Sequence, residues 1–232
     1  MGPRTGQPGA HGKSHAANAD HADDPSHGRI TQDRANAAVA CNRTAVSDYM
    51  SLPSDLPAPE DDGAADHLPG TAMPHLELPS TAGREVTLDQ LGPGRAVVYI
   101  YPMTGQPGVD LPEGWNAIPG ARGCTPETCG FRDHYAELKA AGAATVYGLS
   151  SQSTEYQAEL SERLGLPFEI ISDTGRELAD ALDLPTFTAG DQRLYKRLTL
   201  IIADGRIEHV FYPIFPPDEH AAEVLAWLSA QA

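Results

Sequence analysis

The pattern of apolar and polar positions changes along the chain near residue 64. Residues 1–63 are rich in Pro, Gly, Ala, Asp and His and show no sustained apolar period. Such a segment gains too little from burial to offset its ordering entropy, so it is predicted to be a disordered N-terminal extension. Residues 64–232 alternate short apolar runs with amphipathic stretches, which predicts a single domain. A translation start at Met50 is an open alternative for the residues before it.

Within residues 64–232, the pattern predicts strands and helices in alternation. Runs of four to six apolar residues indicate buried strands, and apolar positions at helical spacing indicate helices. Strands are expected twice within 76–88, then at 96–101, 145–149, 168–171, 197–202 and 206–212, and helices at 125–141, 154–164, 175–182 and 217–230. This order predicts an α/β protein with a thioredoxin-like fold, in which helices cover both faces of a mixed central sheet.

Composition narrows the possible functions. With 16 Lys and Arg against 32 Asp and Glu, the net charge is −16, so neither nucleic acid nor an acidic membrane is an expected partner. No Gly-rich phosphate loop supports a nucleotide cofactor, and no secretion or lipidation signal is expected. Three cysteines in a chain of this length suit a reducing compartment, so a cytoplasmic location is expected.

Candidate chemistry concentrates in the sequence Gly-Cys-Thr-Pro-Glu-Thr-Cys at 123–129. Thr125 followed by Pro126 predicts a helix start, which places Cys124 beside the first helical turn. Free backbone N–H groups and the helix dipole favour an anion there, so the pKa of Cys124 is expected to be lowered.

Charged neighbours modify this expectation for Cys124. Glu127 brings a negative charge within one turn of the sulfur, so a cation is needed to favour the thiolate. Arg122 and Arg197 are the candidates, because a guanidinium is always charged and offers several donors.

The spacing of Cys124 and Cys129 leaves several interpretations open. The two thiols could form a redox pair, Cys129 could be a buried apolar residue, or both could bind zinc with His134, although no fourth ligand lies nearby. In an unbroken helix their Cα atoms would be roughly 8–9 Å apart, beyond the approximately 7 Å that a disulfide tolerates. A disulfide between two helical cysteines therefore requires the first turns to unwind.

From about residue 68 onward, the chain resembles the peroxiredoxin family, and most closely its Q-type, or bacterioferritin-comigratory, group. The similar pieces occur in the family's order. They are Tyr-Ile-Tyr-Pro at 99–102, Gly-Cys-Thr at 123–125 and Cys-Gly-Phe-Arg-Asp at 129–133, then 146–150, 166–168, 172–173 and 196–199.

The resemblance implies a thiol peroxidase that reduces hydrogen peroxide or organic hydroperoxides. It implies that Cys124 is the peroxidatic cysteine, that Cys129 resolves it by an intramolecular disulfide, and that Arg197 supports the thiolate. It also implies recycling by thioredoxin or a similar dithiol, a monomer, and neither cofactor nor metal. A protein dithiol–disulfide oxidoreductase and a non-catalytic redox-sensing module are the alternatives.

One segment departs from the family pattern. The family places Pro and a Ser or Thr just upstream of the peroxidatic cysteine, whereas here residues 105–120 separate Pro102 and Thr104 from Cys124. It is open whether Thr104 reaches the site. The segment is expected to be an ordered lid, and its apolar residues Leu111 and Trp115, with Ile118, are compatible with organic hydroperoxides.

Overall fold

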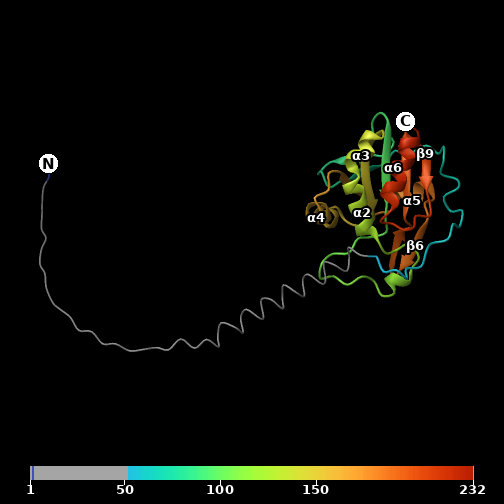
Figure 1. The fold of residues 1–232 in the computed structure, drawn as a ribbon. Coiled ribbons are helices and arrows are strands. Elements are labelled where there is room, and N and C mark those ends of the chain that lie inside the picture. Colours follow the sequence, from blue (N-terminus) through green and yellow to red (C-terminus); the bar gives the residue numbers. More distant parts are fainter. Residues whose placement is uncertain (1, 3–51, 232) are drawn as a thin grey trace, which may run out of the picture. The chain divides into compact units, whose positions relative to one another are not determined.

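The computed structural model describes residue 2 and residues 52–231 (Figure 1). Most of the predicted disordered extension, and Cys41 with it, lies outside the described residues. Within residues 52–63, Asp62 accepts hydrogen bonds from Lys196 Nζ at 2.6 Å and from the Tyr212 hydroxyl at 2.7 Å. Contacts with the domain therefore include residues before position 64, and the predicted boundary stays a prediction.

A five-stranded mixed sheet forms the centre of the domain, in the order β5-β4-β3-β8-β9. Its strands are β3 (Arg95–Ile100), β4 (Ala143–Ser150), β5 (Glu169–Ser172), β8 (Leu198–Ala203) and β9 (Arg206–Phe211). The first three are parallel, and β8 runs antiparallel to both β3 and β9. Central strands covered on both faces need apolar side chains on both, which explains the continuous runs in the sequence.

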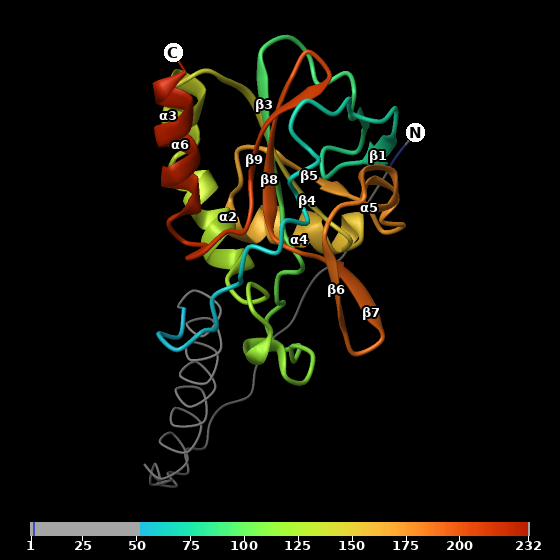
Figure 2. The ribbon, with the colours of Figure 1, turned by 90° about the vertical axis from the view of Figure 1, so that its right-hand side faces the viewer.

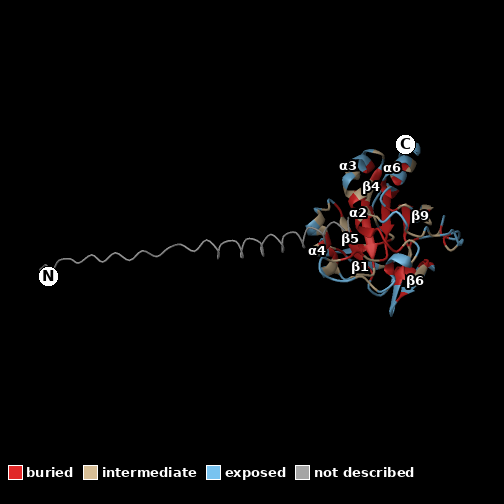
Figure 3. Cartoon of the chain, turned by 60° about the horizontal axis from the view of Figure 1, so that its bottom comes forward, coloured by how far each residue is buried: buried red, intermediate tan, exposed pale blue. Residues whose placement is uncertain are grey.

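Helices cover both faces of this sheet (Figures 2 and 3). One face packs against α2 (Cys124–Asp133), α3 (Tyr135–Ala140), α4 (Thr154–Leu164) and α6 (His220–Ala230). The other face packs against α5 (Glu177–Leu182) and the small hairpin of β1 (Glu77–Pro79) and β2 (Glu85–Thr87). The predicted thioredoxin-like fold is confirmed. No helix in the described part of the chain is long and apolar enough to cross a membrane.

The predicted helix 125–141 is wrong at its start and in its continuity. Helix α2 begins at Cys124, with Gly123 rather than Thr125 as its N-cap, and His134 separates it from α3. Gly123 has a φ of 107°, and a Cβ there would lie 2.3 Å from Pro217 Cγ. Only glycine fits both the backbone conformation and the space, so the N-cap lies two residues earlier than the Thr-Pro signal indicates.

One hairpin of the structure was not predicted from the sequence. Strands β6 (Thr186–Ala189) and β7 (Gln192–Tyr195) project from the same end of the domain as the 105–120 loop (Figure 2). That loop contains the short 3-10 helix η1 (Trp115–Ala117), and Trp115 packs against Phe187 of β6 with ring centroids 6.1 Å apart. The expectation of an ordered loop is confirmed by this packing.

Candidate active site

Strand register brings the candidate site residues to one edge of the sheet. Ile100 of β3 lies opposite Leu198 of β8, so Arg197 lies beside the residues that follow β3. Strand β4 runs parallel to β3, and Gln152 therefore follows it at the same edge. Helix α2 begins there as well and is held by Phe131, which stacks on Tyr99 with centroids 4.2 Å apart.

Cys124 is a free, buried thiol at the first position of α2. Arg197 donates from Nη2 to its Sγ at 3.2 Å, and the backbone N–H of Met103 also donates to it. The thiol itself contacts the carbonyl of Ala121 at 3.6 Å. Two donors aimed at one sulfur are suited to stabilising negative charge on it.

Arg197 is fixed from several sides. Its Nη1 forms a buried ion pair with Glu127, in which the two side chains are 2% and 0% exposed. Its Nη2 also points at the carbonyls of Gly120, Ala121 and Arg122, at 3.3, 3.4 and 3.2 Å. The guanidinium is thereby held in one orientation, with Nη2 directed at Cys124.

Arg122, the other candidate cation, has a different position. Its Nη1 donates to Asn116 Oδ1 at 3.4 Å, within the 105–120 loop. It lines a small cavity together with Cys124. The hydrogen bond to the sulfur, however, comes from Arg197.

The expected lowering of the Cys124 pKa is not found in this geometry. Burial raises the pKa of the thiol, the charge of Arg197 lowers it, and the charge of Glu127 raises it again. Burial likewise raises the pKa of Glu127, against the opposing effect of Arg197. One guanidinium thus faces two acidic groups, and each limits the stabilisation that the other receives.

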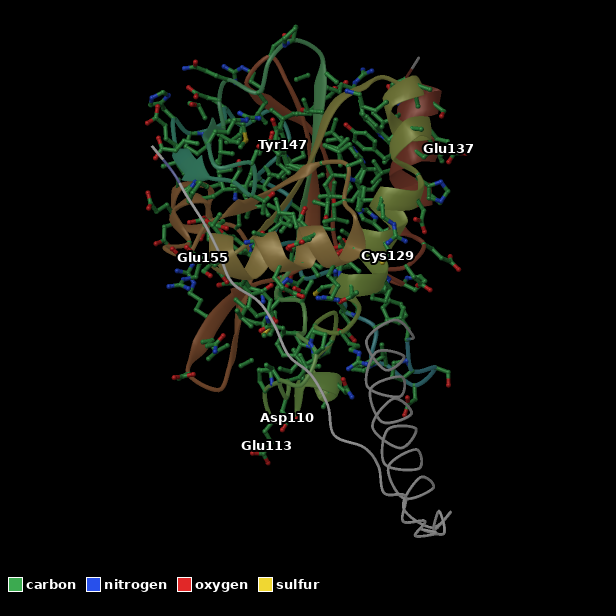
Figure 4. All side chains as sticks on the ribbon, turned by 90° about the vertical axis from the view of Figure 1, so that its left-hand side faces the viewer. Asp110, Glu113, Cys129, Glu137, Tyr147 and Glu155 are labelled. Carbon is green, nitrogen blue, oxygen red and sulfur yellow. The ribbon has the colours of Figure 1, made fainter. Side chains whose placement is uncertain are left out.

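Cys129 lies on the same helix (Figure 4) and is also a free, buried thiol. Burial raises its pKa, and the charges of Arg132 and Arg163 lower it in part. Because α2 is continuous from Cys124 to Asp133, the two Cα atoms have helical spacing, and the disulfide would require unwinding. His134 contacts Glu137 instead of the cysteines, at 2.5 Å, so the zinc interpretation gains no support.

Thr104 reaches the site despite the inserted residues. It lines the cavity that contains Cys124 and is 1% exposed. Its hydroxyl donates to Gln152 Oε1 at 3.1 Å, and its carbonyl accepts from Gln152 Nε2 at 3.1 Å and from the Tyr156 hydroxyl at 2.8 Å. Gln152 and Tyr156 hold Thr104 in place, while the 105–120 loop extends outward.

Several site features escaped the sequence analysis. Glu127 was counted as an opposing charge and not as the ion-pair partner of Arg197. The Met103 amide and Gln152 gave no local signal, because their roles depend on which chain segments meet at the sheet edge.

Replacing Glu127 with glutamine is expected to lower the pKa of Cys124 by about one unit, because a negative charge that competes for Arg197 is removed. The rate of iodoacetamide alkylation, followed against pH in protein carrying Cys41→Ser and Cys129→Ser, reports this pKa. The midpoint of the curve of alkylation rate against pH should move to lower pH in the Glu127→Gln protein. Glu137→Gln, at an exposed position on α3, is the matched control. An unchanged midpoint for Glu127→Gln would contradict the charge coupling.

Comparisons with known proteins identify the family to which this chain is similar. The model of the Redoxin family matches residues 68–225. Peroxiredoxin Bcp of Escherichia coli (strain K12) is 31% identical over 167 residues, which cover 70% of this chain and 96% of that protein. Chloroplastic peroxiredoxin Q of Oryza sativa subsp. japonica is 29% identical over 162 residues, covering 69% of this chain and 66% of the rice protein, just under two thirds of it.

Solved structures show the same fold. Peroxidoxin BcpB from Mycobacterium tuberculosis superposes with a TM-score of 0.58 at 26% identity, covering 72% of this chain and 99% of that one. Peroxiredoxin Q from Xanthomonas campestris superposes with a TM-score of 0.52 at 23% identity, covering 76% and 98%, and supports the fold alone.

The extent of the family match and the identity to the bacterial relative show that this chain belongs to the Redoxin family. Within that family it is a peroxiredoxin of the Q/Bcp group.

Proposed function

We propose that this chain reduces hydroperoxides, with Cys124 as the peroxidatic cysteine, Cys129 as the resolving cysteine and Arg197 as the supporting cation. The observation that carries the proposal is the hydrogen bond of 3.2 Å from Arg197 Nη2 to a buried thiol at a helix start. A second thiol on the same helix supplies the partner for a disulfide.

The first step is attack of the Cys124 thiolate on the terminal oxygen of the hydroperoxide. The S–O bond forms as the O–O bond breaks, and the leaving oxygen takes up a proton as water or an alcohol. Sulfur is oxidised to sulfenic acid and the peroxide is reduced. Arg197 and the Met103 amide stabilise the thiolate.

The second step joins the two cysteines. The Cys129 thiol attacks the sulfenic sulfur, an S–S bond forms, and the sulfenic oxygen leaves as water. Helix α2 must open first, because its continuous turns hold the two cysteines at helical spacing. An external dithiol, which we propose to be thioredoxin, then reduces the disulfide and is itself oxidised.

The proposed setting follows from sequence and family together. Few cysteines and two free thiols suit a reducing compartment such as the cytoplasm. We propose that the protein acts as a monomer.

A coupled assay tests the proposal against its alternatives. Thioredoxin, its reductase and NADPH are mixed with the protein and hydrogen peroxide, and NADPH oxidation is followed. A peroxidase gives peroxide-dependent turnover. A protein dithiol–disulfide oxidoreductase reduces a protein disulfide but does not consume peroxide, and a redox-sensing module reacts once without turnover.

Replacing Cys129 with serine should allow one equivalent of peroxide to react and then stop thioredoxin-dependent turnover, because the sulfenic acid on Cys124 has no intramolecular partner. The amount of peroxide consumed per protein, measured directly, reports the first effect, and NADPH oxidation in the coupled assay reports the second. Cys41→Ser is the control and should turn over like the parent. Full turnover in a protein carrying both substitutions would contradict the resolving role of Cys129.

A further inference from the structure

The cavity that contains Cys124 is very small. Its volume is about 20 Å³, and its wall includes Met103, Leu111 and Trp115 beside the polar Thr104. A single water molecule needs about 10–15 Å³ of such volume. The space therefore suits a molecule of a few heavy atoms at most.

A larger recess lies on the other side of the same wall. This outer recess has a volume of about 590 Å³ and includes the exposed residues Asp110 and Asn116. Leu111, Trp115 and Arg122 line both the outer recess and the Cys124 cavity. These three side chains form the partition between the reactive thiol and a space large enough for a bulky ligand.

Packing holds the partition in place. Trp115 is 3% exposed and belongs to a small apolar cluster with Ala121 of the approach to α2 and with Ala189 and Leu194 of the β6–β7 hairpin. Arg122 is tied to the loop through Asn116. The wall is thus built by the 105–120 loop and braced by the hairpin.

We propose that Leu111 and Trp115 are specificity-determining residues that restrict this peroxidase to hydrogen peroxide and exclude hydroperoxides with bulky apolar groups. The proposal rests on the peroxidase function of Cys124. The apolar residues of the loop fill the space next to the thiol, whereas from the sequence alone they are compatible with organic hydroperoxides. Cumene hydroperoxide, with its phenyl ring, does not fit the cavity unless the partition opens.

The test compares kcat/KM for hydrogen peroxide and for cumene hydroperoxide in the full chain. The parent should prefer hydrogen peroxide by about 10-fold or more, and Trp115→Ala and Leu111→Ala should each reduce that preference by about 10-fold, mainly by raising kcat/KM for cumene hydroperoxide. Glu113→Ala is the control. Glu113 is exposed at the outer end of the loop (Figure 4), lines neither space, and its replacement should leave the preference unchanged.

The possible outcomes separate a failure of the specificity proposal from a failure of the proposed peroxidase function. Equal kcat/KM for both hydroperoxides in the parent, or an unchanged preference in folded Trp115→Ala and Leu111→Ala proteins, would overturn the partition. Lack of activity with either hydroperoxide would overturn the peroxidase function itself. Circular dichroism checks the folding of each variant. If the Trp115→Ala protein fails to fold, the proposal is tested by the Leu111→Ala protein and by the preference of the parent protein for hydrogen peroxide over cumene hydroperoxide.

Discussion

Replacing Cys124 with serine is expected to lower peroxide consumption with thioredoxin by about three orders of magnitude or more. A serine hydroxyl is scarcely ionised near neutral pH, so Arg197 and the Met103 amide would have no nucleophile to stabilise. The substitution is nearly isosteric in a buried position, so the fold should persist. NADPH oxidation in the coupled assay measures the loss, and the thermal unfolding curve verifies the fold.

Cys41→Ser is the matched control for this prediction, because it removes a thiol outside the matched family domain. Its rate should equal that of the parent. If folded Cys124→Ser protein consumed peroxide at the parental rate, Cys124 would not be the peroxidatic cysteine.

Replacing Arg197 with methionine should reduce the rate of Cys124 oxidation by about 100-fold or more, because a donor preorganised on the reacting sulfur is lost. The charge that lowers the pKa of Cys124 is lost as well. Stopped-flow tryptophan fluorescence after mixing with peroxide measures this step, since Trp115 lines the Cys124 cavity. Arg193→Met, at an exposed position on β7, is the control for removing a positive charge.

Loss of Arg197 also leaves Glu127 as a buried carboxylate without its cation, which destabilises the fold by an amount typical of broken buried pairs, about 3–5 kcal/mol. A protein carrying Arg197→Met and Glu127→Gln removes both charges and separates the two effects. Recovered stability with a slow reaction would support the role of Arg197 at the sulfur. A parental reaction rate in that protein would contradict it.

Much of the fold could be predicted because local signals and tertiary packing agree. Helix α4 has the predicted bounds Thr154–Leu164, since Ser153 caps its start by accepting from the Tyr156 N–H and Gly165 ends it in the left-handed conformation. Strands β3 and β4 are buried on both faces, and continuous apolar runs identify such strands.

Elements that depend on distant contacts were missed. The β6–β7 hairpin is short, and its packing comes from Trp115, some 70 residues earlier in the chain. The direction of the Cys124 pKa shift was missed for a similar reason. A helix start favours a thiolate locally, but the complete burial that opposes it is a property of the folded domain.

The candidate site was predicted in part. Cys124 and Cys129 were identified from their position, and the resemblance singled out Arg197, which the strand register brings to the sulfur. The contact between Arg197 and Glu127 spans 70 positions of the sequence and could not be read from either residue alone. Likewise, the inserted residues concealed that Thr104 lies in the same cavity as Cys124.

The most direct test of the central claim is the mass of one peptide after a stoichiometric reaction. Reduced Cys41→Ser protein is treated with one equivalent of hydrogen peroxide, blocked with an alkylating agent and digested with trypsin. Cleavage after Arg122 and Arg132 places both thiols in the peptide 123–132. The account predicts that this peptide loses two hydrogens and takes up no alkyl group. A peptide alkylated on both cysteines would contradict it.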